Sequence, residues 1–118
     1  PSLVATPLYL CGAEEQKQTY LPLFTGEAIP KVASAFLEPV ILFDPTQLRA
    51  TARREGDFYL LTGEKTMVIN APEAELFLIY AHDEETDSTQ AFLTPAPAAG
   101  LTVGERDKWM GLNALKTY

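Results

Sequence analysis

A strict alternation of apolar and polar residues between positions 47 and 53 constrains the fold of this chain more than any other feature. Leu48, Ala50 and Ala52 alternate with polar or charged residues. Successive side chains of a β-strand point to opposite faces of a sheet, so this period of two predicts a half-buried strand. Turn residues follow at 55–57, and residues 58–61 are again apolar. The whole stretch therefore predicts a β-hairpin.

Short apolar runs separated by turn residues continue through the rest of the chain. The continuous apolar run at 76–81 is typical of a strand that is buried on both faces. Four further runs are predicted to be strands, at residues 31–37, 66–69, 91–94 and 101–103. Residues 13–20 carry acidic side chains first and a lysine later, which favours one short helix that ends near Pro22. We therefore expect a mainly β fold, an antiparallel β-barrel or sandwich preceded by one short helix.

Composition excludes several classes of partner. A net charge of −7 with nine scattered Lys and Arg residues argues against nucleic acid as a partner. No apolar run reaches the roughly 20 residues of a membrane-spanning helix, so no membrane partner is expected. The N-terminus also lacks the basic leader of a signal peptide. The single cysteine, Cys11, fits a reducing compartment, and we expect a cytoplasmic protein. Because the chain starts at Pro1 without a methionine, we also expect it to be a piece of a longer protein.

Residues that commonly carry chemistry are few and scattered. His82 is the only histidine and precedes an acidic run at 83–87, which favours a solvated loop over a catalytic or metal site. Ser34 and Ser88 lack the strand–turn–helix setting of an activated nucleophile. Cys11 is expected to be a small buried apolar residue. We therefore predict no catalytic residue and no metal ligand on this chain.

Seven segments occur in an order that resembles the acyl-CoA dehydrogenase family. They are GAEEQKQTYLP, GE, LEP, ATARREGDFYLLTGEKTMVINA, AELFLIYA, AFLTPAPAAGLTV and KWMGLNAL, and they extend from Gly12 to Thr117. The texture of residues 95–102 looks most like the short-chain members. The resemblance implies that residues 1–26 are the end of an N-terminal helical domain and residues 27–118 a middle β-barrel domain. It also implies that the C-terminal helical domain of the family is absent from this chain.

The function that the resemblance implies is FAD-dependent α,β-dehydrogenation of acyl-CoA thioesters. The catalytic base of most members comes from the C-terminal domain, so none is expected here. The middle domain of the family supplies one wall of the flavin site and part of the thioester pocket. The implied cofactor is therefore FAD, and the implied partners are an acyl-CoA thioester and further subunits of a homo- or hetero-oligomer.

Two flavin motifs of the family are present in altered form. In the first, Glu38, Pro39 and Asp44 match, but Leu42 replaces a glycine. In the second, residues 67–70 read Met-Val-Ile-Asn where the family has Trp-Ile-Thr-Asn. The resemblance assigns cofactor binding to Phe36, Leu37, Phe43, Met67 and Ile69, and Phe43 also to the substrate.

The altered positions leave a second interpretation open. Leu37, Phe43 and Ile69 stand where the family has hydroxyl side chains, and each polar flavin atom left unpaired would cost about 1–3 kcal/mol. Backbone groups near Phe36 and Leu37 do not depend on those side chains. The alternative is a domain of the family fold without flavin, acting as a structural subunit or as an acyl-CoA or lipid-binding module. The apolar run at 40–43 is predicted to be covered by the β-core or by another chain.

Overall fold

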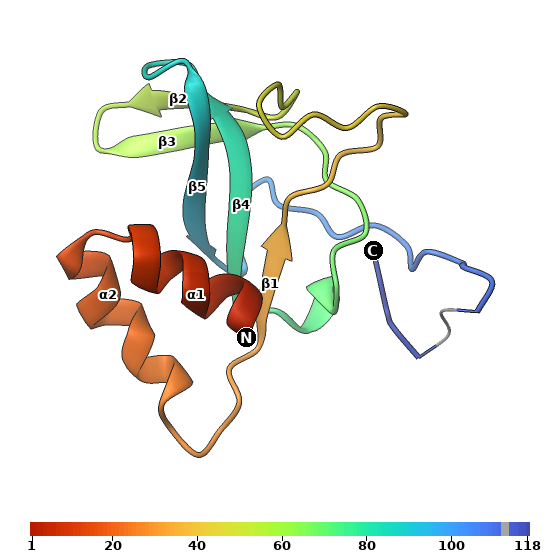
Figure 1. Cartoon of the computed structure of the whole chain (residues 1–118), viewed down its shortest axis with the longest axis horizontal. Coiled ribbons are helices and arrows are strands. Elements are labelled where there is room, and N and C mark those ends of the chain that lie inside the picture. The colour runs from red at the N-terminus through yellow and green to blue at the C-terminus, as the bar shows by residue number, and fades with distance from the viewer. Residues whose placement is uncertain (112–113) are drawn as a thin grey trace.

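The computed structural model describes residues 1–111 and 114–118, and in these residues two α-helices precede a five-stranded sheet (Figure 1). The helices are α1 (Ser2–Cys11) and α2 (Glu14–Tyr20), followed by a 3-10 turn, η1 (Leu21–Phe24). The strands are β1 (Val32–Ala35), β2 (Thr51–Glu55), β3 (Phe58–Thr62), β4 (Leu76–Asp83) and β5 (Ser88–Pro95), with a second 3-10 turn, η2 (Ala71–Glu73), before β4.

Strand β4 organises the sheet, because three other strands pair with it. Its whole length pairs antiparallel with β5. Its residues 76–79 pair parallel with β1, and its last two residues pair parallel with the start of β2. Because β5 occupies one edge of β4 along its full length, β1 and β2 follow one another along the other edge. Strand β3 pairs antiparallel with β2 and completes the predicted hairpin.

The mainly β prediction is confirmed, but the strand directions and the closure of the sheet need correction. The structure has a mixed and open sheet in place of the expected antiparallel barrel or sandwich. Alternation reports which face a side chain takes and carries no information about the direction of the neighbouring strand. The short turns after β2 and β4 force antiparallel pairing, whereas the long connections from β1 and β2 to β4 permit the parallel pairing that is observed.

Both faces of β4 are covered, as the apolar run at 76–81 predicts. One face packs against α1, and on the other face the side chains of β4 contact those of the neighbouring strand β1, of residues 50–52 and of the segment at 68–71. The three buried clusters are Val4, Leu76 and Leu78; Ala33, Ala35, Val68, Ala71 and Phe77; and Ala50, Ala52 and Ala81. Leu48 is buried as well, so the apolar face of the alternating stretch is the inner face of the sheet.

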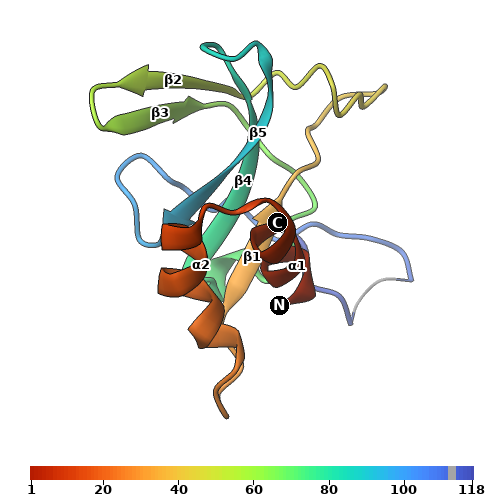
Figure 2. The ribbon, with the colours of Figure 1, turned by 60° about the vertical axis from the view of Figure 1, so that its left-hand side comes forward.

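The helices lie together near one end of β4 and β5, and the β2–β3 hairpin lies at the other end, as Figures 1 and 2 both show. Helix α2 confirms the short helix predicted at 13–20. Helix α1 is an additional helix, and the sequence concealed it because Pro7, ordinarily a helix breaker, lies inside it. Val4 and Leu8 are its buried residues. No helix within residues 1–111 and 114–118 has the length and hydrophobicity that a bilayer crossing requires.

The segment at 66–69 is not the regular strand that its composition predicts. Met67 and Asn70 have positive φ angles of 54° and 53°, which interrupt an extended ladder. Pairing is therefore short: Val68 exchanges two backbone hydrogen bonds with Tyr118, at 2.9 and 3.0 Å, and Ile69 forms an isolated bridge with Thr117. Residues 101–103, also predicted to be a strand, have no regular secondary structure.

Candidate functional site

The turn that follows β1 is closed by the carboxylate of Glu38. Its two oxygens accept hydrogen bonds from the backbone N–H groups of Arg49 and Ala50, each at 2.7 Å. The carboxylate therefore joins the start of the turn to the chain just before β2. At the far side of the turn, Asp44 accepts hydrogen bonds from the backbone N–H and the hydroxyl of Thr46 at 2.9 and 2.7 Å. These bonds hold the pKa of Asp44 below its ordinary value.

A buried ion pair connects this turn to the segment after β3. The Nζ of Lys65 lies 3.2 Å from Glu38 Oε2 and donates to the carbonyl oxygen of Phe36, also at 3.2 Å. The side chains of Lys65 and Glu38 are only 9% and 3% exposed. Bringing two charges this far out of water costs several kcal/mol per ion, and the hydrogen bonds around them offset that cost.

The pKa values of the pair reflect both burial and contact. Burial raises the pKa of Glu38, but the hydrogen bonds from Arg49, Ala50 and Lys65 lower it by more, so it lies below its ordinary value. Burial also lowers the pKa of Lys65, and the neighbouring carboxylate reverses only part of that change. Above the ordinary pKa of a glutamate the carboxylate is therefore charged and stabilises the pair.

A backbone hydrogen bond places the two altered flavin motifs against each other. The N–H of Thr66 donates to the carbonyl oxygen of Leu37 at 2.9 Å. Met67 follows directly in a left-handed conformation, with a φ angle of 54°. The side chains of Leu37 and Met67 are both partly open to solvent, since each residue is 37% exposed. The hydrogen bond therefore brings together two backbone segments that are far apart in the sequence, each with a partly exposed apolar residue.

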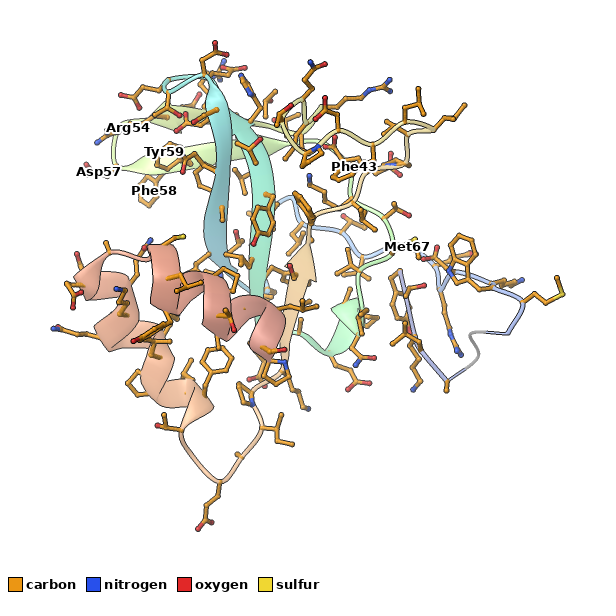
Figure 3. All side chains as sticks on the ribbon, viewed as in Figure 1. Phe43, Arg54, Asp57, Phe58, Tyr59 and Met67 are labelled. Carbon is orange, nitrogen blue, oxygen red and sulfur yellow. The ribbon has the colours of Figure 1, made fainter. Side chains whose placement is uncertain are left out.

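The third altered position, Phe43, turns back on the start of the same turn. Its ring packs edge-on against Phe36, with centroids 5.1 Å apart and planes at 85°. Phe36 in turn packs against Tyr80 of β4 at 4.7 Å. Figure 3 places Phe43 and Met67 on the side of the molecule away from the tip of the β2–β3 hairpin, where Arg54, Asp57, Phe58 and Tyr59 are labelled. We call Leu37, Phe43 and Met67 the candidate wall.

The remaining predicted positions lie around the candidate wall. Phe36 lies behind it, between Phe43 and Tyr80. Ile69 is two residues beyond Met67, at its bridge with Thr117, and it is partly buried. The cofactor and substrate roles of all five positions stay predictions.

The apolar run at 40–43 is not covered by the core of this chain. Ile41 is completely exposed and Leu42 is 89% exposed, although Phe43 is partly buried. The prediction that the β-core covers this run is therefore wrong for Ile41 and Leu42, because the turn carries them away from the sheet. Coverage by another chain stays a prediction.

Sequence reasoning missed a groove of about 610 Å³ on the face of the sheet opposite α1. Sheet residues such as Ala35, Ala50, Phe77 and Ile79 line it, together with the loop at 98–104, which lies below β3 in Figure 2. Its lining from β4 alternates as Phe77, Ile79 and Ala81. That alternation was visible in the sequence, but the position of the loop was not.

Two other residues differ from their sequence interpretation. His82 belongs to β4 and not to the following loop, and its Nε2 lies 3.1 Å from Asp87 Oδ1. Cys11 is exposed at the end of α1, not buried. Across the described part of the chain, no group of three or more His, Cys, Asp or Glu side chains is arranged to hold a metal ion.

Comparison with known proteins identifies the family. The family described as "Acyl-CoA dehydrogenase, middle domain" matches residues 33–118. The chain is 34% identical over 115 residues to the 3-(aryl)acrylate reductase of Clostridium sporogenes, covering 94% of this chain and 30% of that protein. It is also 34% identical over 120 residues to the short-chain specific acyl-CoA dehydrogenase of human mitochondria, covering 98% and 29%.

Solved structures agree with these relatives. A glutaryl-CoA dehydrogenase from Mycobacterium smegmatis, in complex with FADH2, superposes with a TM-score of 0.82 at 32% identity, over 98% of this chain and 29% of that one. The prolyl acyl carrier protein oxidase AnaB superposes with a TM-score of 0.83 at 33% identity, over 98% and 31%. The chain thus spans about 30% of the length of the curated relatives described above. It belongs to the acyl-CoA dehydrogenase family and has the fold of that family's middle domain.

Proposed function

We propose that this chain supplies the middle-domain wall of an FAD-dependent enzyme that dehydrogenates acyl-CoA thioesters at the α and β carbons. The observation that supports the proposal is the hydrogen bond from Thr66 to Leu37, because it brings together two segments that match flavin motifs of the family, each with a partly exposed apolar residue. Within this proposal, residues 1–26 are the end of a helical domain and residues 27–118 are the middle domain. The acyl-CoA thioester and further subunits are the proposed partners.

The candidate wall fits the face of a flavin ring better than its polar edge. Leu37 and Met67 offer exposed apolar surface, and a methionine thioether makes favourable contacts with aromatic rings. The side chains of Leu37, Phe43 and Ile69 carry no hydroxyl, so hydrogen bonds to the edge of the ring and to the pyrophosphate would come from groups other than these three side chains. When bound, FAD would accept the hydride that leaves the β carbon of the substrate.

This chain has a structural share in the proposed reaction. Its residues would bind one face of the flavin, exclude water from it and border the thioester. No side chain of this chain is proposed as the base that removes the α proton. That group, and most polar contacts to the cofactor, would come from other parts of the protein.

A second candidate function is a domain of the same fold that no longer binds flavin. The exposure of Ile41 and Leu42 favours it, because large apolar residues at a turn are a hazard unless a ligand or another chain covers them. In that case the exposed apolar surface around Ile41 and Leu42 would hold an acyl chain or a partner subunit. Its role would then be structural or that of an acyl-CoA or lipid-binding module.

The colour of the purified full-length protein separates the two functions. The proposed enzyme is expected to carry FAD with the visible absorbance of a bound flavin, and to reduce an artificial electron acceptor when an acyl-CoA is added. A colourless protein that shows no saturable FAD binding at micromolar concentration would exclude the enzyme and leave the second candidate.

A further inference from the structure

The carboxylate of Glu38 makes more contacts than the closure of one turn requires. The two backbone N–H groups of Arg49 and Ala50 already satisfy one lone pair on each oxygen. The ammonium of Lys65 is a third donor and arrives from a segment 27 residues away. It is this third contact that connects the turn to the segment containing Met67.

The ammonium group of Lys65 has two hydrogen-bond partners in the turn after β1. It contacts the carbonyl oxygen of Phe36 as well as the carboxylate of Glu38. The residues on either side of Leu37 therefore both bind the same cation. Directly beside this contact, the N–H of Thr66 donates to the carbonyl oxygen of Leu37. One hydrogen bond alone would leave the two segments free to rotate about it, whereas two adjacent attachments fix their relative orientation.

Stability alone does not account for a buried ion pair at this place. Replacing such a pair by apolar residues of similar volume is often neutral or stabilising, because the charges must be removed from water. Retaining the pair is better explained by geometry, since a lysine and a carboxylate with three defined donors allow few alternative arrangements. The geometry that this pair constrains is the placement of the backbone at Phe36 and Leu37 against the segment that contains Lys65 and Thr66.

We propose that Glu38 and Lys65 are positioning residues of the candidate wall. They hold the segment that contains Leu37 and the segment that contains Met67 in a fixed relative orientation for a planar ligand. The proposal rests on the proposed function, because it assigns the flavin as that ligand. Neither residue touches the ligand in this proposal. They act through the backbone of Phe36 and Leu37 on one side and through that of Thr66 and Met67 on the other.

The first test measures the attachment itself, without any ligand. Hydrogen–deuterium exchange of the full-length protein is compared for wild type, Lys65→Met and Lys31→Met, with mass spectrometry of peptides that cover 36–44, 63–70 and 76–95. Lys31 is exposed and precedes β1, so Lys31→Met controls for the same chemical change away from the wall. In Lys65→Met, exchange of the first two peptides is expected to rise at least tenfold, while the β4–β5 peptide stays unchanged.

Two outcomes of this test overturn the proposal. If exchange at 36–44 and 63–70 in Lys65→Met equals that in Lys31→Met, the ion pair does not hold the wall. If exchange rises equally in all three peptides, the pair acts through global stability and has no positioning role. Should Lys65→Met fail to fold, Lys65→Gln takes its place, because it removes the charge and keeps an N–H donor, on a side chain that is one bond shorter.

The second test connects the attachment to the ligand. FAD affinity is measured by titration of the apoprotein for the same variants and for Lys65→Arg. Lys65→Met is expected to lose at least tenfold in affinity and to change the visible circular dichroism of the bound flavin, and Lys65→Arg is expected to restore both. Unchanged affinity and spectrum in Lys65→Met would overturn the proposal. If wild type binds no FAD, the proposed function fails, and the exchange experiment still decides whether the pair positions the two segments.

Discussion

Strand β4 and the turn after Pro39 contain similar runs of large apolar residues, but the run in β4 is buried and the run in the turn is largely exposed. Residues 76–78 are at most 5% exposed, whereas Ile41 and Leu42 are almost entirely exposed. The difference comes from the backbone, since β4 has paired strands along both edges and the turn has none. In this chain the paired run of β4 belongs to the core, whereas the unpaired run in the turn leaves an apolar surface that is available to a ligand or a partner.

The largest expected effect comes from emptying the core of β4. Phe77→Ala removes a ring that packs against β1 and the segment at 68–71, and a cavity of this kind costs about 3–5 kcal/mol. Leu42→Ala is the matched control in the exposed run, with an expected change within about 0.5 kcal/mol. Urea denaturation measures both free energies of unfolding. Equal losses for the two variants would break the comparison.

The ion pair beneath the turn is expected to be the next most sensitive point. Glu38→Gln leaves the ammonium of Lys65 buried beside a neutral amide, and removal of one partner of a buried pair typically costs about 3 kcal/mol or more. Glu14→Gln is the control, because the Glu14 side chain is 81% exposed in its pair with Lys17 and the loss of this pair is expected to cost well under 1 kcal/mol. Thermal unfolding measures the melting temperatures of the two variants. Equal melting temperatures would show that the buried pair contributes no more stability than the pair of Glu14 and Lys17.

The same carboxylate predicts a loss of stability in acid. The pKa of Glu38 in the folded chain lies below its ordinary value of 4.5, so the unfolded chain binds the proton more readily. The contribution of Glu38 is complete above the ordinary pKa and disappears as the pH falls through the lower, folded pKa. Melting temperatures measured from pH 6 to pH 2.5 are expected to fall less steeply in Glu38→Gln than in wild type. Parallel curves would show that Glu38 does not contribute to the acid transition.

A smaller effect is expected where the segment after β3 passes Ala50, the residue before β2. Gly63 has a φ of 148°, and a Cβ at this position would lie 2.6 Å from the Cα and the Cβ of Ala50. Gly63→Ala is therefore expected to cost about 1–3 kcal/mol through strain and displacement of the segment. Gly104→Ala is a suitable control, because a Cβ there meets no atom within 4 Å. Chemical denaturation compares the two, and equal stabilities would argue against close packing at Gly63.

The smallest effect on stability is expected at the tip of the turn. Ile41→Lys and Leu42→Lys change residues that the chain does not bury, so the free energy of unfolding should move by no more than about 0.5 kcal/mol. If a ligand or another chain covers this tip, the same substitutions should alter oligomeric state or acyl-CoA affinity. Size-exclusion chromatography with light scattering and an acyl-CoA titration measure the two. A large loss of stability would instead place the tip in the core.

The sequence predicted the sheet correctly wherever the period of its apolar residues matches the burial of a strand. The alternation around Ala50 and the unbroken run of β4 predicted the inner face of the sheet, and the turn at Gly56 predicted the hairpin. Parallel pairing could not be predicted, because it depends on where the long connections lead and not on the pattern within a strand. Helix α1 was missed because Pro7 is an unfavourable helix residue whose effect tertiary packing overrides.

The candidate site was only partly predictable, because it depends on contacts between segments that are far apart in the sequence. The resemblance named the five flavin positions, but nothing local in the sequence indicated that Thr66 would bond to Leu37. The role of Lys65 was likewise hidden, since a single lysine next to a glutamate, two residues after a glycine, is ordinarily a solvated residue. Contacts between distant segments become visible only once both are placed on the sheet.

The central claim is that the partly exposed apolar residues of the candidate wall bind a ligand, whereas an exposed apolar residue elsewhere does not. FAD titration of the full-length apoprotein tests it with Met67→Asp and Phe58→Asp, since Phe58 is 78% exposed on the β2–β3 hairpin, away from the wall. The account predicts at least tenfold weaker FAD binding for Met67→Asp and unchanged binding for Phe58→Asp. Equal affinities for both variants, or no FAD binding by the wild type, would contradict it.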